Sequence, residues 1–221
     1  FVLVRGRQMT RATPPPFATP AELVVALENC ASGLKAGGDD RDPQQQIDAI
    51  LARVAPANAG WRNRGDVAAA LGFNYGEARC WEEGIAALNL ALCAEGGSAS
   101  IAVIEQRANY RVRLATARFK ALPVSRAKDP TVRARPLIKE ISDCIAELEH
   151  LRMLGDTTER LHLLGAANKR LALIHALLGD KRECIEALAR MAAHHHAALE
   201  RARTLGDSSP SYSYTNWATA T

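Results

Sequence analysis

The sequence has few aromatic residues and no long apolar run, and each deficit excludes a class of protein. Phe, Trp and Tyr make up 5% of the 221 residues, so a sandwich or barrel held by aromatic cross-strand pairs is not expected. No uninterrupted apolar run approaches the roughly 18 residues that a membrane-spanning helix needs, so we expect no membrane partner. β-Branched aliphatics are also scarce, with 10 Val and 10 Ile against 41 Ala and 25 Leu. This composition favours helix, because Ala and Leu lose little conformational freedom in a helix.

Cysteine is too sparse and too irregularly spaced for a disulfide framework. The five cysteines are odd in number and contain no C-x-x-C pair, which also argues against a zinc ribbon. Cys93, Cys144 and Cys184 lie in apolar helical patterns, so we expect them in the core. No secretory signal is visible, and we therefore expect a cytoplasmic protein. The first residue is Phe1, which suggests the C-terminal region of a longer protein.

Prolines separate an N-terminal segment from a helical region. Residues 1–19 are predicted to be an arm and a linker, because Pro14, Pro15 and Pro16 resist helix formation. Start and stop signals predict a helical domain over 20–221, with helices at 20–34, 43–54, 61–79, 81–94, 98–122, 135–154, 157–178 and 181–204. The segment 123–135 is predicted to be a basic loop or first turn, and 208–221 an incomplete element. Asp156 and Asp180 are predicted caps, each followed by Glu at the third helical position.

Two internal similarities indicate a repeated architecture. Residues 152–158 recur at 203–209, a separation of 51 residues. Ala108-Asn109-Tyr110-Arg111 is also similar to Ala167-Asn168-Lys169-Arg170. Helix pairs that recur with a period of 20–50 residues are typical of an α-solenoid.

Segment 65–98 makes the architecture more specific. Leu71, Gly72 and Tyr75 are followed, after a short gap, by a second set of small or apolar residues. These are Gly84, Leu88, Ala91 and Gly96. This spacing resembles the tetratricopeptide repeat, although Ala68 replaces the usual Trp and Gly96 the usual Pro. The resemblance implies an all-α fold in which antiparallel helix pairs stack into a right-handed superhelix, with further pairs at 98–154 and 157–205. Gly72 and Gly84 would let the two helices of one pair approach closely.

No catalytic motif accompanies this pattern. The sequence has no P-loop, no Rossmann glycine pattern, no H-E-x-x-H and no G-x-S-x-G. His194, His195 and His196 cannot converge on one ion, because successive helical residues diverge by about 100°. We therefore expect a protein with no enzymatic activity, no catalytic residue, no metal and no cofactor.

One stretch is strongly basic. Residues 107–139 carry a net charge of +9 from one acid, Asp129, and ten basic residues, which are Arg107, Arg111, Arg113, Arg118, Lys120, Arg126, Lys128, Arg133, Arg135 and Lys139. A solvated helix face normally mixes both signs, so the stretch is a candidate anion-binding surface, although a plain solvated face remains open. Nucleic acid is a less favoured ligand, because aromatic residues for base stacking are few.

The resemblance also implies where a ligand would bind, because the first helices of tetratricopeptide repeats line a concave groove. Equating Leu71 with Leu164, and Asn109 with Asn168, places the following residues in the groove: Asp66, Phe73, Gly76, Glu77, Arg107, Tyr110, Arg111, Glu159, His162, Lys169 and Arg170. Of these, we expect Arg107, Tyr110, Arg111, His162, Lys169 and Arg170 to bind the partner. We predict a non-catalytic scaffold that binds an acidic peptide or partner segment. The alternatives are a nucleic-acid-binding module that uses 107–139, and a regulatory or sensor domain of an upstream enzyme.

Overall fold

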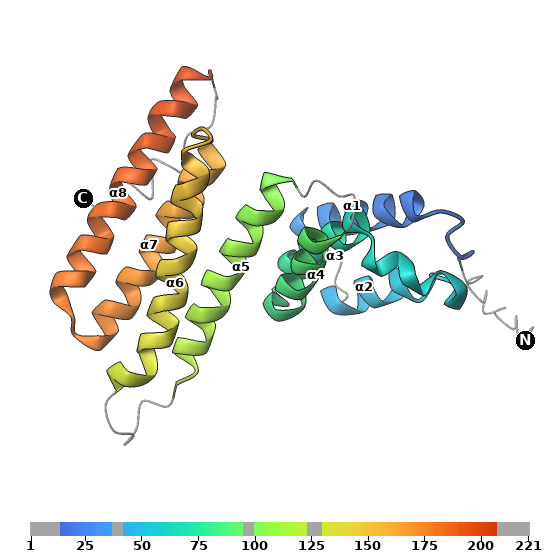
Figure 1. Ribbon diagram of the computed structural model, residues 1–221, viewed down its shortest axis with the longest axis horizontal. Helices are drawn as coiled ribbons and strands as arrows, with labels where there is room; N and C mark the ends of the chain where they lie inside the picture. Colours follow the sequence, from blue (N-terminus) through green and yellow to red (C-terminus); the bar gives the residue numbers. More distant parts are fainter. Residues whose placement is uncertain (1–13, 37–41, 95–99, 123–129, 207–221) are drawn as a thin grey trace, which may run out of the picture.

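The computed structural model describes residues 14–36, 42–94, 100–122 and 130–206 (Figure 1). This part of the chain contains eight α-helices, one 3₁₀-helix and no strand, so the all-α prediction is confirmed. The elements are α1 (Pro20–Ala36), α2 (Pro43–Leu51), the 3₁₀-helix η1 (Pro56–Asn63), α3 (Gly65–Glu77), α4 (Trp81–Cys93), α5 (Ile101–Lys120), α6 (Pro130–Arg152), α7 (Thr158–Leu178) and α8 (Lys181–Thr204). The predicted element at 208–221 and most of the predicted loop at 123–135 lie outside the described residues.

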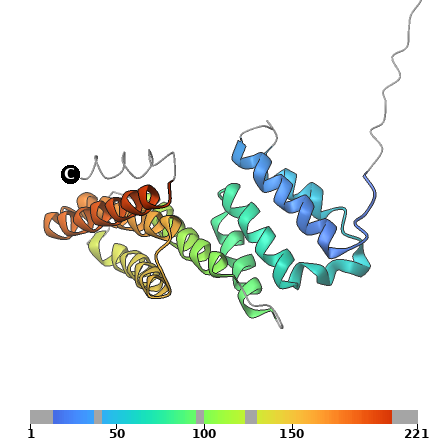
Figure 2. The same ribbon diagram turned by 90° about the horizontal axis from the view of Figure 1, so that it is seen from above.

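The helices pack in chain order. Figures 1 and 2 show α5 between the N-terminal helices α1–α4 and the C-terminal helices α6–α8. Each helix from α3 onward contacts the next one, and α1 contacts α3, α3 contacts α5 and α5 contacts α7. The first helices of successive pairs therefore lie side by side along one face, which we call the first-helix face.

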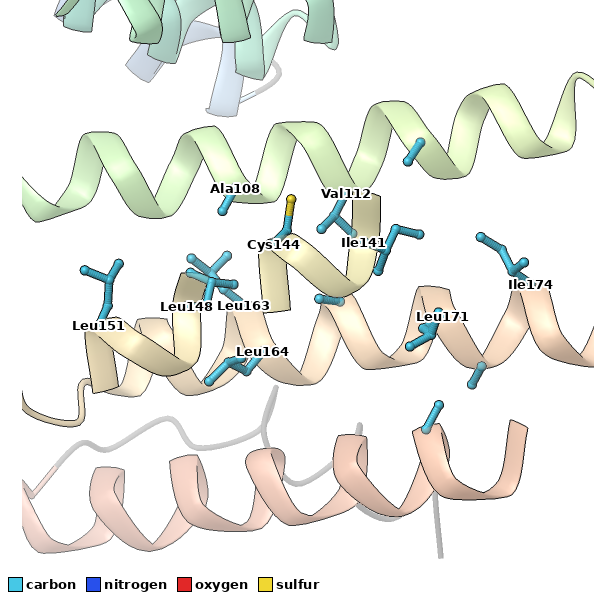
Figure 3. Packing of buried hydrophobic residues seen from close by; sticks show 14 residues of the cluster. Ala108, Val112, Ile141, Cys144, Leu148, Leu151, Leu163, Leu164, Leu171 and Ile174 are labelled. Atoms are coloured by element: carbon cyan, nitrogen blue, oxygen red, sulfur yellow. The ribbon is translucent and has the colours of Figure 1, made fainter. Parts of the chain in front are cut away.

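Three consecutive clusters of buried side chains form the core. The first joins α1, α2 and α3 with Ala87 of α4, the second joins α3, α4 and α5, and the third joins α5 to α8. Cys144 of α6 belongs to the third cluster and points toward Ala108 and Val112 of α5 (Figure 3). Burial raises the pKa of the Cys144 thiol to about 12, so it stays neutral and packs as an apolar group. The core is thus distributed along the chain.

The core expectation is wrong for one cysteine. Cys144 is buried and Cys184 is half-buried, but Cys93 is exposed. Leu88 and Ala91 carry the buried face of α4. Cys93 follows Ala91 by two residues, or about 200° around the helix, so its side chain points to the opposite side.

Glycines permit the close approach of α3 and α4 that the sequence predicts. A Cβ at Gly72 would lie 2.4 Å from Leu88 Cδ2, and one at Gly84 would lie 3.4 Å from the Gly72 carbonyl oxygen. Gly84 also makes room for the ring of Tyr110, which a Cβ would approach to 3.2 Å. The predicted close approach of α3 and α4 is therefore confirmed, and the Tyr110 ring of α5 packs beside the same glycines.

Of the two predicted caps, Asp180 is confirmed and Asp156 is not, and Asp42 also caps a helix. The Asp42 side chain accepts from Gln44 N at 3.1 Å, and the Asp180 side chain accepts from Glu183 N at 3.4 Å. Asp156 is not the cap of α7. Thr157 Oγ1 accepts from Arg160 N at 3.0 Å. Asp156 instead pairs with Arg152 at 2.9 Å, because an ion pair within the turn competes for its carboxylate.

Two predicted boundaries are corrected. The helix expected over 61–79 is interrupted at Arg64, whose backbone is extended, so that η1 ends at Asn63 and α3 begins at Gly65. Asp66 stabilises the new start, since its Oδ1 accepts from Val67 N at 2.8 Å and from Arg64 Nε at 3.2 Å. α6 begins at Pro130, within the predicted loop 123–135, because proline fits the first turn of a helix.

The end of the predicted linker packs on the helical domain. Phe17 is buried in the first core cluster, and its amide donates to the Arg53 carbonyl at 3.3 Å. The Arg53 guanidinium lies 4.0 Å from the centroid of the Phe17 ring, and its Nε donates to the Pro15 carbonyl at 3.1 Å. Residues 15–17 are therefore part of the folded unit.

A buried ion pair sets the position of α7 against α5. Arg160 Nε donates to Glu105 Oε1 at 2.7 Å, and the two side chains are 4% and 10% exposed. Arg160 Nη1 also donates to the Leu151 carbonyl at 2.8 Å and to the Gly155 carbonyl. One guanidinium thus joins α5, the end of α6 and the start of α7.

Candidate functional site

Arg107 and Arg111, two of the predicted groove residues, hold α5 against α6. Arg111 Nε donates to Glu140 Oε1 at 2.7 Å, and its Nη1 donates to Glu147 Oε2 at 3.1 Å. Arg107 Nη2 pairs with the other oxygen of Glu147, and its Nη1 donates to Asn89 Oδ1 at 3.3 Å. Carboxylates of the fold therefore already balance both guanidinium groups. They line a hollow of about 530 Å³ between α4, α5 and α6, to which Glu140 also contributes.

Other cations of the basic stretch are paired as well. Arg118 Nη2 lies 2.8 Å from Glu82 Oε1, and Lys139 Nζ lies 2.6 Å from Asp143 Oδ2. Carboxylates outside residues 107–139 thus offset much of the local charge. Arg133 and Arg135 are exposed on α6.

A groove of about 560 Å³ between α5, α7 and α8 brings together a different set of cations. We call it the α5–α7–α8 groove. Lys169 and Arg170 of the predicted set lie here with Arg113 and Lys120. Of the described residues that line it, these four are basic and none is acidic, and the rest are Thr116, Ala166, Ala172, Leu173, Ala176, Cys184 and Leu188. A basic rim over a largely apolar floor suits an anionic ligand that also carries an apolar group.

A smaller hollow of about 330 Å³ lies farther along the first-helix face. We call it the α1–α3–α5 hollow, and its lining residues are Leu34, Lys35, Gly76, Glu77, Arg79, Trp81, Gln106, Tyr110 and Arg113. Arg113 lines both this hollow and the α5–α7–α8 groove. The two depressions therefore meet at Arg113 and form one predominantly basic surface.

The sequence places Tyr110 in an open groove, but in the structure its side chain is buried. Its side chain is packed into the second core cluster, with its ring centroid 5.5 Å from that of Trp81. A Cβ at Gly76 would lie 1.9 Å from the Tyr110 hydroxyl oxygen, so the phenol occupies the space beside Gly76. Burial raises the pKa of Tyr110, and the phenol stays protonated. Tyr110 and Gly76 both line the α1–α3–α5 hollow.

The histidines diverge as the sequence predicts. His194 Nε2 lies 3.3 Å from Glu149 Oε1 of α6, whereas His195 lies against Gly165 and His162 of α7. Burial lowers the pKa of His195 to about 4, and His162 and Lys169 act in the same direction. Within the described ranges, no three His, Cys, Asp or Glu side chains lie close enough together to hold a metal ion.

The predicted groove residues are thus spread over several surfaces, and the reason is register. The match of Asn109 with Asn168 implies neighbours 59 residues apart. The contacts between α5 and α7 instead join Glu105 to Arg160, 55 residues apart, and Gln106 to Glu159, 53 residues apart. This shift is about one helical turn or slightly more, so residues at least one turn nearer the C-terminus of α5 lie level with the α7 cations.

Sequence reasoning missed Lys35 and Arg79, and it did not place Arg113 and Lys120 in the groove. The spacing of Arg113, Thr116 and Lys120 was an available signal, because positions i, i+3 and i+7 share one helical face. For Arg79 the sequence holds no such signal, since its role depends on the turn between α3 and α4.

Comparisons with known proteins found no relative. No protein-family model matches the chain, and no match was found among curated proteins or among solved structures. In the described segments, no helix combines the length and the apolar character that crossing a membrane requires.

Proposed function

We propose that this chain is a non-catalytic interaction module of tetratricopeptide type, which binds an acidic segment of a protein partner on its first-helix face. The helix pairs would stack into a right-handed superhelix. Two observations support this architecture: first helices contact first helices along the chain, and the core divides into consecutive clusters. All five cysteines are unbridged, which fits a reducing compartment, and we propose the cytoplasm.

The α5–α7–α8 groove carries the proposal. It joins four cations and an apolar floor in a depression where no described lining residue is acidic. A hydrogen-bonded contact between charged groups contributes about 1.5–3 kcal/mol, and burial of a leucine-sized side chain contributes about as much. A segment with a leucine between acidic residues would use both properties of this groove.

The hollow that contains Arg107 and Arg111 is a weaker candidate for the same ligand. An incoming carboxylate would have to compete with Glu140 and Glu147, which already accept hydrogen bonds from both guanidinium groups. We therefore propose Lys120 and Lys169, in place of Arg107 and Arg111, as the residues that bind the partner.

The test measures binding of a fluorescent peptide that has a leucine between two pairs of aspartates. Lys120 and Lys169 are both exposed, so Lys120→Gln/Lys169→Gln should leave the fold intact. We expect this double variant to weaken binding by about 100-fold, because it removes two charged contacts. Lys139→Gln is the matched control, since Lys139 is also exposed but lies outside the groove.

Two results would contradict the proposal. The first is unchanged peptide affinity in Lys120→Gln/Lys169→Gln. The second is tighter binding of RNA or DNA, with a steep salt dependence and a loss of affinity in Arg133→Gln/Arg135→Gln, which would favour the nucleic-acid alternative.

A further inference from the structure

The turn between α3 and α4 places an arginine where the backbone favours glycine. Arg79 has a φ of 61°, and among the described residues it is the sole non-glycine with a positive φ. Its N–H donates to the Gly76 carbonyl at 3.1 Å, and Cys80 N–H donates to the Tyr75 carbonyl at 2.8 Å. This pair of bonds is the Schellman motif, in which the left-handed position usually holds glycine.

The equivalent turn after α7 has the same two bonds and the expected residue. There Gly179 has a φ of 79° and donates to the Ala176 carbonyl at 3.1 Å, while Asp180 N–H donates to the His175 carbonyl at 2.9 Å. A side chain destabilises this conformation because its Cβ crowds the following carbonyl oxygen. Strained residues of this kind concentrate at binding sites.

Arg79 lines the α1–α3–α5 hollow together with donors from two other first helices. α1 supplies Lys35, and α5 supplies Gln106, Tyr110 and Arg113. With Trp81, six side chains of this lining can thus donate hydrogen bonds, and three of them carry a positive charge. Glu77 is the acidic member of the lining.

Packing holds two of these donors in place before any ligand binds. Arg113 Nε donates to Asn109 Oδ1 at 3.1 Å, and its guanidinium lies 5.1 Å from the centroid of the Trp81 ring. The Tyr110 phenol is held beside Gly76, where a Cβ would lie 1.9 Å from its oxygen. Donors fixed in this way lose little conformational entropy on binding.

We propose that the α1–α3–α5 hollow binds a phosphoryl group carried on a serine side chain of a protein partner. A phosphoryl group has three acceptor oxygens and a charge of about −1.5 to −2 at neutral pH, which matches three cations and a protonated phenol from α1, the α3–α4 turn and α5. A carboxylate has two oxygens, and one bidentate arginine satisfies it. The site shares only Arg113 with the α5–α7–α8 groove, so it goes beyond the acidic-segment proposal.

The experiment compares three peptides with neutral flanking residues that carry phosphoserine, glutamate or serine at one position, using isothermal titration calorimetry on the full chain. We expect phosphoserine to bind at least about tenfold more tightly than glutamate, since it makes at least one more charged contact. Arg79→Gly introduces the residue that usually occupies this position of the turn, so the turn should be preserved. Because it removes one cation from the hollow, it should weaken phosphopeptide binding about tenfold or more. Glu77→Gln should strengthen it, because it removes the acid from the lining.

Controls separate this site from the α5–α7–α8 groove. Arg62→Gln removes an exposed arginine of η1 outside the hollow and should leave phosphopeptide affinity unchanged. Lys120→Gln/Lys169→Gln should also leave it unchanged, even though we expect it to weaken binding of the aspartate peptide about 100-fold. Equal binding of the phosphoserine and serine peptides would overturn the inference, as would unchanged affinity in both Arg79→Gly and Lys35→Gln. If inorganic phosphate displaced the phosphopeptide with a dissociation constant equal to that of the phosphopeptide, the assignment to a protein-borne phosphoryl group would be overturned.

Discussion

Replacement of Arg160 by leucine should be strongly destabilising, although Arg160 lies outside both proposed binding sites. The Arg160 and Glu105 side chains are 4% and 10% exposed, and their ion pair is 2.7 Å long. Arg160→Leu would leave the Glu105 carboxylate buried without its partner, a change that typically costs about 3–5 kcal/mol. It would also remove the donor to the Leu151 and Gly155 carbonyls. We therefore expect a loss of about 4–5 kcal/mol, a large part of the stability of a domain of this size.

The matched control is Arg152→Leu. Arg152 forms two ion pairs, to Glu149 at 3.0 Å and to Asp156 at 2.9 Å, so it has as many ionic contacts as any arginine of the described chain. Its side chain is 34% exposed, however, and water screens these pairs. We expect a loss of about 1 kcal/mol or less. The difference between the stability losses of the two variants therefore reports the effect of burial, separately from the number of ionic contacts.

Urea unfolding followed by circular dichroism at 222 nm measures both values, and equal slopes are needed to compare them. The double variant Glu105→Leu/Arg160→Leu completes the test, because it removes the stranded charge. It should recover at least about 1.5 kcal/mol relative to the sum of the single losses. If Arg160→Leu loses no more stability than Arg152→Leu, the pair is not desolvated and the reasoning is refuted.

Three further predictions concern the backbone and the buried histidine. Gly165→Ala should lower the free energy of unfolding by about 1–3 kcal/mol, because its Cβ would lie 2.5 Å from His195 Nε2. In Gly33→Ala the new Cβ meets nothing within 4 Å, so this variant should stabilise α1 by about 0.5–1 kcal/mol. Urea unfolding measures both variants, and equal effects would contradict the argument. Arg79→Gly should raise stability by about 0.5–1 kcal/mol while it weakens phosphopeptide binding, because glycine relieves the positive φ; a loss of stability would show that the arginine packs favourably there. Burial lowers the pKa of His195 to about 4 from an ordinary value of 6.5, so the folded state binds the proton less well than the unfolded state. The stability from the neutral imidazole is therefore complete above about pH 6.5 and decreases by about 3 kcal/mol as the pH falls toward 4, and His195→Leu should flatten this part of a stability–pH profile.

Much of the helical pattern was predictable because its signals are local. Asp42-Pro43 marks the start of α2, and the Asp180 side chain caps α8, as the order of residues alone indicates. The helix start predicted at 61 was wrong, since η1 runs from Pro56 to Asn63 through that position. The interruption came instead at Arg64, where Asp66 offers its carboxylate to the neighbouring backbone and guanidinium. Competition between short-range side-chain bonds of this kind is difficult to rank from sequence.

The candidate site was less predictable because charge depends on partners that are distant in the chain. Lys169 and Arg170 line a basic groove between α5, α7 and α8. Arg107 and Arg111 are also basic residues of a first helix, and they are joined to Glu140 and Glu147. Net charge over a stretch of sequence does not show which cations the folded protein has already neutralised.

The sequence by itself determined that this protein is helical and built from consecutive pairs, because propensity, caps and glycine positions act within a few residues of one another. Tertiary structure decided which faces of the helices meet. The contacts of Glu105 with Arg160 and of Gln106 with Glu159 set the register of α5 against α7, and a shift of about one turn places side chains farther along α5 beside the α7 cations. It also decided that Arg113 joins the two depressions of the first-helix face. Such placements depend on the packing of residues more than 50 positions apart, which no local pattern encodes.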